Sequence, residues 1–328
     1  MNLPDTESVP VTISLLDPSV TSLNHGDQII IQAVRRELQE LFPQAFIRNF
    51  STHLPLGRFA RRLIAASPLT IVGGSNLLAS DMYGYRQWQI SLLDSLVVKQ
   101  AVLMGVGWWQ YQSKPTNYTR LLLKRLLHPT LLHAVRDSYT RQQLLEAGIS
   151  NTLLTGCPSL WRLTADHYRQ IPRVKGEEVL FTLTDYLPDP VADLALCSTL
   201  CASYDKVFFW PQGSEDLNYL ASVGFSSHNL EILPSSLAAF DELLESDRSL
   251  DYVGTRLHAG IRALQYGRRS LIVAIDNRAT EMGKDFGLPV VLRGDISNVA
   301  QLLTSQFVTE LQLPWKAIEE WKGQFTAL

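Results

Sequence analysis

The chain alternates between two patterns of hydrophobic residues. Short runs rich in Val, Ile, Leu and Phe are separated by longer segments in which apolar residues recur at helical spacing. This rhythm is typical of βαβ units, in which helices cover both faces of a parallel sheet. We expect strands in both halves of the chain, at residues 11–15, 45–49, 69–72, 101–104, 131–135, 152–154, 179–183, 206–210, 250–253, 270–274 and 290–292.

The repetition of this rhythm predicts two domains. A chain of 328 residues is longer than one compact domain usually is. Residues 163–178 contain Pro172 and a charged run, which suits an exposed linker. We therefore expect two Rossmann-like doubly wound α/β domains, residues 1–171 and 172–328, facing across a cleft as in the GT-B architecture. Trp315, Ile318 and Trp321 predict a final amphipathic helix that docks on one of them.

Charge and cysteine content narrow the function classes. The net charge is -3 and the pI is about 6.2, which argues against a nucleic-acid binder. The three cysteines, Cys157, Cys197 and Cys201, show neither zinc-ligand spacing nor a disulfide framework, so we expect a reducing compartment and no metal. The acidic start and the lack of a long apolar run predict a cytoplasmic chain that does not span a membrane.

One strand end carries the strongest candidate chemistry. Residues 251–260 read Asp-Tyr-Val-Gly-Thr-Arg-Leu-His-Ala-Gly, and Thr255 can cap a helix whose apolar stripe begins at Leu257. Arg256 and His258 then lie in the first turn, where they can face a cleft. Arginine offers a planar fork for phosphate or carboxylate, and histidine can exchange a proton near neutral pH. A surface arginine and a helix-end histidine are the alternative.

A second strand end runs into Gly73, Gly74, Ser75 and Asn76. Paired glycines would let backbone amides approach a ligand, and we expect the polar pair to open a helix. Neither the dinucleotide-binding spacing nor a Walker lysine is present. A tight turn with Ser75 as a helix cap explains the pattern equally well.

Other polar residues follow predicted strands. Arg136 could be another anion clamp, or it could pair with Asp137. Asp27 precedes an amphipathic helix and is well placed to cap it. Trp108, Trp109 and Tyr111 could stack on a sugar ring or pack in the core. The basic segment 120–127 could rest on an anionic membrane surface or be a helix with an apolar core face and solvated cations.

Taken together, these motifs resemble the polysaccharide pyruvyl transferase family. The similarity covers about three-quarters of the chain, and its most specific element is Arg-Leu-His at Arg256 to His258. The contributing segments, in the order of the family, are residues 26–27, 73–77, 135–138, 155–159 and 254–259. Where the family often has a third glycine, this chain has Ser75.

The resemblance implies an activity and roles for residues. Members transfer the enolpyruvyl carbons of phosphoenolpyruvate to a sugar of a cell-surface glycan or its lipid-linked precursor, usually as a cyclic ketal. Arg256 and His258 would contact phosphoenolpyruvate, and Arg136 would be a further anion-binding residue. We expect His258 to be the general acid, with no cofactor beyond this donor substrate. The substrate-binding residues would also include Asp27, Gly73, Gly74, Ser75 and Asn76.

Two other functions are compatible with the same pattern. A glycosyltransferase of the same architecture would use a nucleotide sugar, with Asp276 and Glu281 as candidate ribose-binding carboxylates. An inactive relative would bind a glycan or regulate an assembly. The acceptor sugar and the oligomeric state are not readable from the sequence.

Overall fold

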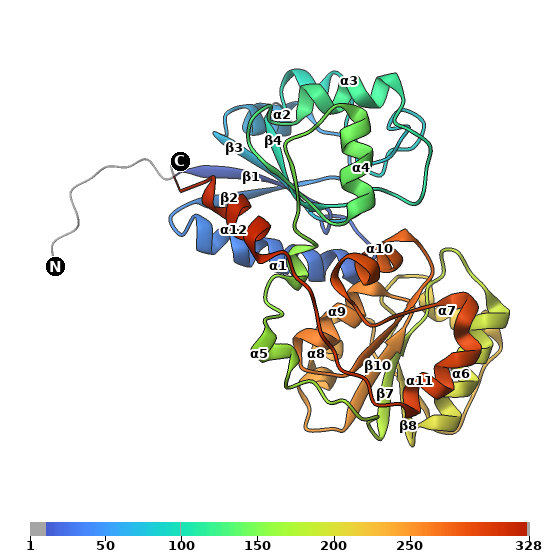
Figure 1. Ribbon diagram of the computed structural model, residues 1–328. Coiled ribbons are helices and arrows are strands. Elements are labelled where there is room, and N and C mark those ends of the chain that lie inside the picture. Colours follow the sequence, from blue (N-terminus) through green and yellow to red (C-terminus); the bar gives the residue numbers. More distant parts are fainter. Residues whose placement is uncertain (1–10, 99, 327–328) are drawn as a thin grey trace, which may run out of the picture.

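The computed structural model describes residues 11–98 and 100–326 and shows two parallel six-stranded sheets, one in each half of the chain (Figure 1). The strand order is β2-β1-β3-β4-β5-β6 in the first sheet and β12-β11-β10-β7-β8-β9 in the second. Every strand pairing is parallel. Helices cover both sheets, so the two Rossmann-like domains expected from the sequence are confirmed.

The described part of the first domain contains six strands and four α-helices. They are β1 (Thr12–Asp17), α1 (His25–Leu41), β2 (Phe46–Ser51), α2 (Arg58–Ala65), β3 (Leu69–Gly73), η1 (Asp94–Leu96), β4 (Ala101–Val106), α3 (Asn117–Leu126), β5 (His133–Val135), α4 (Ser138–Ala147) and β6 (Thr152–Leu154).

The second half begins after a connection that contains η2 (Pro158–Leu160) and α5 (Ala165–Tyr168). Its elements are β7 (Glu178–Thr182), α6 (Pro190–Ser203), β8 (Lys206–Phe209), α7 (Asp216–Val223), β9 (Leu230–Ile232), α8 (Leu237–Glu245), β10 (Leu250–Gly254), α9 (Leu257–Gln265), β11 (Ser270–Ala274), α10 (Asn277–Phe286), β12 (Val290–Leu292), η3 (Arg293–Asn298), α11 (Val299–Thr304) and α12 (Trp315–Gly323).

All eleven predicted strands are confirmed, with ends shifted by at most two residues. The sequence prediction missed β9, an edge strand of three residues in which Glu231 and Ile232 are exposed. A strand this short has too few buried positions to produce a readable pattern.

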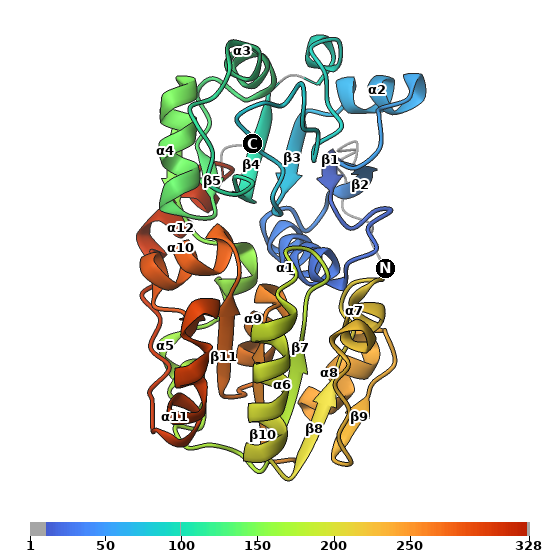
Figure 2. The same cartoon turned by 90° about the vertical axis from the view of Figure 1, so that its right-hand side faces the viewer.

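The strand order explains where a ligand can bind. In the first sheet, β2 lies on one side of β1 and β3 to β6 lie on the other, so the order in which strands are added to the sheet reverses at β1. In the second sheet the same reversal occurs at β7, which lies between β8 and β10. Loops at such a reversal leave the sheet in opposite directions and open a crevice at the carboxyl ends of the strands. The carboxyl ends of the two sheets face one another (Figure 2), and residues from both domains line one pocket between them.

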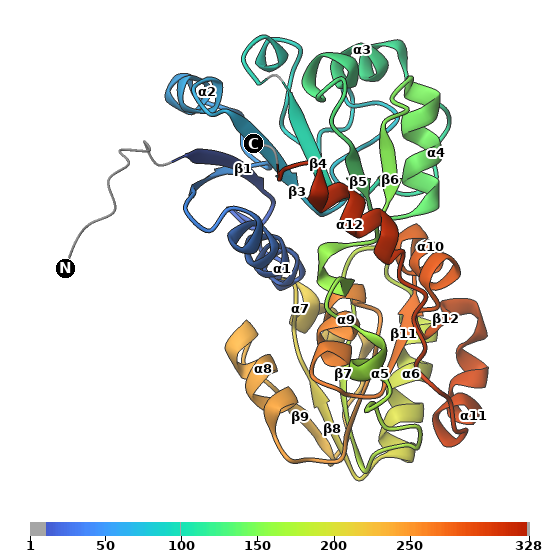
Figure 3. The same ribbon diagram turned by 60° about the vertical axis from the view of Figure 1, so that its left-hand side comes forward.

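The domains are joined by a shared apolar core. Ile30 and Ile31 of α1 belong to the same buried cluster as Leu257 and Ile261 of α9. The last helix, α12, crosses back to the first domain and packs against β5 and β6 (Figure 3). Trp321 of α12 is fully buried. The domain boundary near residue 171 stays a prediction.

Candidate active site

The facing strand ends enclose a narrow polar chamber between the domains. It is only about 20 Å³ in volume and opens into an outer cleft of about 410 Å³. Five residues, Asn24, Asp27, Ser75, Asn76 and Arg278, line both spaces. The remaining chamber residues are Ile30, Arg136, Gln212, Thr255, Arg256, Leu257 and His258.

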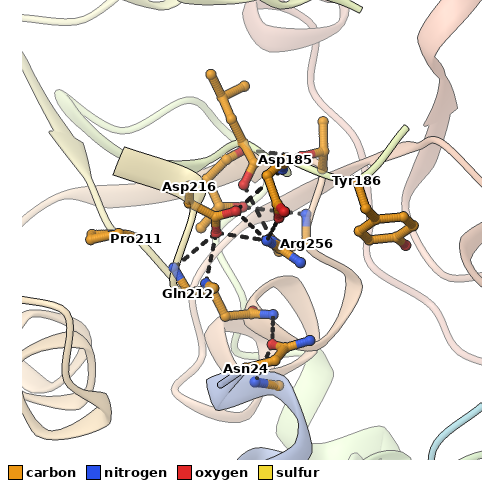
Figure 4. A network of polar contacts seen from close by, with 12 residues as sticks. Asn24, Asp185, Tyr186, Pro211, Gln212, Asp216 and Arg256 are labelled. Atoms are coloured by element: carbon orange, nitrogen blue, oxygen red, sulfur yellow. Dashed lines mark hydrogen bonds and ion pairs between the residues drawn. The ribbon is translucent and has the colours of Figure 1, made fainter. Parts of the chain in front are cut away.

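Arg256 lies between the carboxyl ends of β7 and β10, where the strand order of the second sheet reverses. Its Nε donates to Asp216 Oδ2 at 3.1 Å, and its Nη2 donates to Asp185 Oδ1 at 2.9 Å and to the other oxygen of Asp216 (Figure 4). The side chain is almost completely buried. Among residues 11–98 and 100–326, no hydrogen bond involves its Nη1, so this nitrogen remains available to a ligand.

Asp216 fixes this guanidinium by its own contacts. Its Oδ2 accepts from the backbone N–H groups of Gln212, at 3.1 Å, and Gly213, at 2.8 Å. Burial raises the pKa of the Asp216 carboxyl, while the charge of Arg256 acts in the opposite direction. Gln212 also donates to Asn24 Oδ1 at 2.8 Å, which links the second domain to the start of α1. The strand-end interpretation of the sequence did not single out Asp216, because it lies seven residues beyond β8.

His258 is the second residue of α9, within the first turn as predicted, and it is buried. Its Nε2 lies 3.7 Å from Cys157 Sγ, across the domain interface. Burial, and secondarily the charge of Arg136, lowers the pKa of His258 to about 3. The imidazole is therefore uncharged near neutral pH in the free protein. The helix cap differs from the prediction: Arg256 occupies the N-cap, and the Thr255 hydroxyl points instead to the carbonyl of Thr182.

Arg136 follows β5 and is the deepest cation of the site. Its Nε donates to Asp137 at 2.8 Å, and its other nitrogens donate to Asn76 and to the carbonyl of Trp108. Asp137 also caps α4 by accepting from Thr140 N. Gly107 makes this position possible, because a β-carbon there would overlap the guanidinium of Arg136.

Arg278 is a third chamber arginine that the sequence interpretation missed. It lies at the start of α10, where its Nε and Nη2 both donate to Asp276 Oδ2 at 2.8 and 2.6 Å. No hydrogen bond to the described residues uses its Nη1. Burial, and then the charge of Arg136, lowers the pKa of Arg278 to about 10, so it remains a cation near neutral pH. Its position four residues after β11 was the available signal, since strand ends in such sheets bind ligands.

Asp27 and Ser75 connect the first-domain loops. Ser75 Oγ donates to Asp27 Oδ1 at 2.9 Å, and Ser22 Oγ donates to Asp27 Oδ2 at 2.7 Å. The removal of water raises the pKa of Asp27. Asp27 is not the helix cap that was predicted, because Asn24 accepts from Gly26 N and caps α1. Ser75 has φ of 63°, a left-handed conformation that glycine adopts more easily.

The two glycines before Ser75 have a packing role that differs from the expected one. An added β-carbon at Gly73 would come within 2.8 Å of Ile31, and one at Gly74 would overlap Ile30. The N–H of Gly74 donates to the carbonyl of Met104. Both residues thus allow α1 to approach β3, and they are not among the residues that line the chamber. The helix predicted to follow is also absent, because residues 76–93 contain no α-helix.

The outer cleft carries aromatic side chains and amides. Trp109 stacks on Tyr85 at a centroid distance of 3.8 Å, and Tyr186 faces them from the second domain. Gln87 and Gln110 line the same space. Trp108, by contrast, is fully buried and packs in the core. Of the three aromatic residues predicted to stack or pack, Trp108 has the core role, while Trp109 and Tyr111 line open space.

Both candidate ribose-binding carboxylates already have protein partners. Asp276 accepts from Arg278 and from the hydroxyl of Tyr186, and burial raises its pKa to about 6. Glu281 accepts from Tyr111 Oη at 2.7 Å and from Ser138 Oγ at 3.2 Å, so it joins the two domains. Across residues 11–98 and 100–326, no group of three acidic, histidine or cysteine side chains could hold a metal ion.

Comparisons with solved structures find distant similarities of fold. A UDP-N-acetylglucosamine 2-epimerase from Rickettsia bellii is 12% identical over 96% of this chain and 95% of that chain, with a TM-score of 0.49. The S. aureus MnaA co-structure with UDP is 10% identical over 89% and 87%, with a TM-score of 0.48. The UDP-GlcNAc 2-epimerase from Neisseria meningitidis is 13% identical over 96% and 93%, with a TM-score of 0.44. Likenesses of this degree say nothing about the ligand of this chain.

Sequence comparisons are more informative. None of the curated proteins matches the chain. The family model for polysaccharide pyruvyl transferase matches residues 24–277, which include Asn24, Arg136, Arg256 and His258 and end one residue before Arg278. Because this match covers most of the chain, the protein belongs to the polysaccharide pyruvyl transferase family.

Proposed function

We propose that this protein transfers the pyruvyl group of phosphoenolpyruvate to a sugar of a cell-surface glycan or its lipid-linked precursor, forming a pyruvate ketal. The observation that carries the proposal is the convergence of three arginines, Arg136, Arg256 and Arg278, with one histidine on a single chamber. Phosphoenolpyruvate carries a phosphate and a carboxylate, and arginine binds both groups through paired N–H donors.

The free guanidinium nitrogens indicate how the donor would bind. Arg256 and Arg278 each hold a carboxylate with one edge and leave Nη1 without a bond to the described residues. A chamber of about 20 Å³ has room for about one water molecule, so donor binding requires movement. We expect Asp185 to be the residue that moves, because it is partly exposed and holds Arg256 through one oxygen. Its displacement would free a second edge of that guanidinium.

The reaction balances with the residues present. His258 donates a proton to the methylene carbon of phosphoenolpyruvate, and a sugar hydroxyl attacks the neighbouring carbon while losing its own proton. A second hydroxyl of the sugar then displaces phosphate and closes the ketal; of the two hydroxyl protons released, one leaves with the phosphate and the other restores the proton on His258. Asp27 and Asp276 lie in the cleft as candidate acceptors of the hydroxyl protons. General acid catalysis by a positioned histidine contributes about 10²- to 10⁴-fold.

This role requires that His258 gain a proton when the donor binds. Its pKa is about 3 in the free protein because it is buried beside Arg136. A bound phosphate and carboxylate would place negative charge next to the ring and raise that pKa. We therefore expect donor binding to take up about one proton. The proposal needs no metal or organic cofactor, and it places the enzyme on the cytoplasmic side of the membrane, where phosphoenolpyruvate is found.

The experiment is an assay of phosphate release from phosphoenolpyruvate with a panel of glycan acceptors. Wild-type protein is expected to release phosphate only when an acceptor with two suitably spaced hydroxyls is present, and His258→Ala to lose at least 10²-fold in rate. Mass spectrometry of the acceptor should show the added pyruvyl group. Transfer of a glycosyl group from a nucleotide sugar by wild-type protein, without phosphate release from phosphoenolpyruvate, would contradict the proposal.

A further inference from the structure

One end of the first domain carries a continuous surface formed by α2, η1 and α3. Helices α2 and α3 lie at the end of the domain that faces away from the second domain in all three views (Figures 1, 2 and 3). Arg61 of α2 forms an ion pair with Asp94 of η1 at 2.7 Å. η1 also contacts α3. We call this surface, comprising residues 54–66, 91–98 and 117–127, the distal face.

The distal face is strongly basic in an acidic protein. It contains one carboxylate, Asp94, which is buried and already paired with Arg61. The net charge of the whole chain is -3, so the positive charge of this face is a local feature. Its cations are Arg58, Arg61, Arg62, Arg120, Lys124 and Arg125.

Exposed apolar side chains are interspersed with these cations. Phe59 and Leu93 are each 71% exposed, Leu96 is 51% exposed and Leu121 is 47% exposed. Most leucines of the basic segment 120–127 do not contribute to this surface. Leu122, Leu123 and Leu126 of α3 are buried in the core. That segment alone is therefore a core-packed helix, and the exposed apolar groups come mainly from α2 and η1.

We propose that the distal face binds the surface of an anionic lipid bilayer. Basic residues near such a surface are attracted to anionic headgroups by about 1 kcal/mol each, and exposed Phe and Leu side chains insert at the boundary of the acyl chains. The apolar groups favour a membrane over a soluble polyanion, which would bind through the cations alone. In the described part of the chain no helix is long and apolar enough to cross a membrane, so binding would be peripheral.

The distal face and the outer cleft are joined by one loop. Tyr85 and Gln87 line the cleft, and Leu93 and Leu96 of the same connection lie on the distal face. The same β3–β4 connection therefore contributes residues to both the distal face and the outer cleft. The binding proposal itself does not rest on the proposed reaction.

The test is co-sedimentation of the full chain with vesicles of phosphatidylcholine alone or with 30% phosphatidylglycerol, at about 0.1 M salt. We expect binding only to the anionic vesicles. Arg58→Gln with Arg62→Gln should weaken the partition coefficient by roughly 30-fold, because two basic residues contribute about 1 kcal/mol each. Phe59→Ser should also weaken it.

Matched control variants distinguish a specific effect of the distal face from the effect of removing charged or apolar side chains anywhere on the protein. Arg169→Gln with Lys316→Gln removes two exposed cations elsewhere and should leave binding almost unchanged. Val191→Ser removes an apolar side chain that is 81% exposed on α6 and serves as the control for Phe59. Equal losses in the control and test variants, no binding to anionic vesicles, or binding to soluble polyphosphate that outcompetes vesicles would each overturn the proposal. Melting temperatures of all variants establish that they are folded.

Discussion

The two walls of the cleft are built differently. On the second-domain wall, Arg256, His258 and Arg278 follow β10 and β11 within four residues and lie at the starts of α9 and α10. On the first-domain wall, Tyr85 lies in the β3–β4 connection, whose described residues contain no α-helix, and Trp109 lies in the loop between β4 and α3. The second wall is rich in cations, whereas the first offers aromatic rings, amides and Asp27 around a single arginine.

This difference suggests a division of labour. Cations on short, rigid turns can hold a compact anion in a fixed orientation. Stacked aromatic rings and amides on longer loops suit the faces and hydroxyls of a sugar. We infer that the second domain holds the phosphate and carboxylate of the donor, that Arg136 completes this site, and that the first domain positions the acceptor.

The largest effect is expected for Arg256→Ala. Removing this cation leaves the carboxylates of Asp185 and Asp216 without their partner, and Asp216 is buried. We expect the free energy of unfolding to fall by about 3 to 5 kcal/mol and donor binding to be abolished. Arg256→Lys keeps the charge but loses the fork, so it should fold better and still bind poorly. Chemical denaturation and calorimetric titration measure the two effects. Wild-type affinity for phosphoenolpyruvate in Arg256→Lys would contradict a bidentate role.

His258→Ala should reduce turnover by about 10²- to 10⁴-fold while keeping most donor affinity. In wild type, donor binding should be accompanied by proton uptake, which titrations in buffers of different ionisation enthalpy can detect. The variant should lack this uptake. If wild type takes up no proton, the neutral imidazole is not converted to an acid by the donor, and the general-acid assignment fails.

The lowered pKa of His258 also predicts how the free energy of unfolding changes with pH. Its pKa is lowered from 6.5 to about 3 in the folded protein, so between these values the unfolded chain binds more protons. Its contribution to stability is therefore full above pH 6.5 and is lost as the pH falls toward 3. Denaturation curves of wild type and His258→Gln should diverge over this range, with the variant less sensitive to acid. Parallel curves would show that His258 is not buried as described.

A smaller effect is expected for Gly107→Ala on the first-domain wall. The added methyl group overlaps the Arg136 guanidinium and must displace it from Asn76 and Asp137. We expect KM for phosphoenolpyruvate to rise by roughly 10- to 100-fold, the value of one charge-assisted hydrogen bond. Gly294→Ala is the control, because nothing lies within 4 Å of its added carbon. Equal kinetics of the two variants would remove Arg136 from the donor site.

The smallest of these effects, and the one that tests the division directly, is expected for Trp109→Leu. Loss of the indole from the Tyr85 stack should raise KM for the acceptor by about 10-fold, since an aromatic pair contributes roughly 0.5 to 1.5 kcal/mol. Donor binding should be unchanged. A variant that loses donor affinity but not acceptor affinity would reverse the assignment of the two walls.

The sequence indicated some residues of each wall and missed others. The β10 end was readable because Arg256 and His258 follow a buried strand directly, and Arg136 follows β5 in the same way. Asp216 was missed because it lies seven residues beyond β8, whereas Arg278 was missed although it lies four residues beyond β11, the same spacing as His258 after β10. The glycine pair looked like a ligand loop, yet its purpose is the close approach of α1, a long-range contact that local sequence does not encode. The Tyr85 stack likewise depends on loops that meet only in three dimensions.

The most direct test of the central claim is a thermal-shift titration with phosphoenolpyruvate beside inorganic phosphate and UDP sugars, on wild type and Arg278→Gln. Ligand at 100 times its dissociation constant should stabilise the wild type by about 2.7 kcal/mol. The account predicts a shift specific to phosphoenolpyruvate that Arg278→Gln loses, although Tyr186 still holds Asp276. A shift with UDP sugars alone, or one with phosphoenolpyruvate that Arg278→Gln retains in full, would contradict the three-arginine donor site.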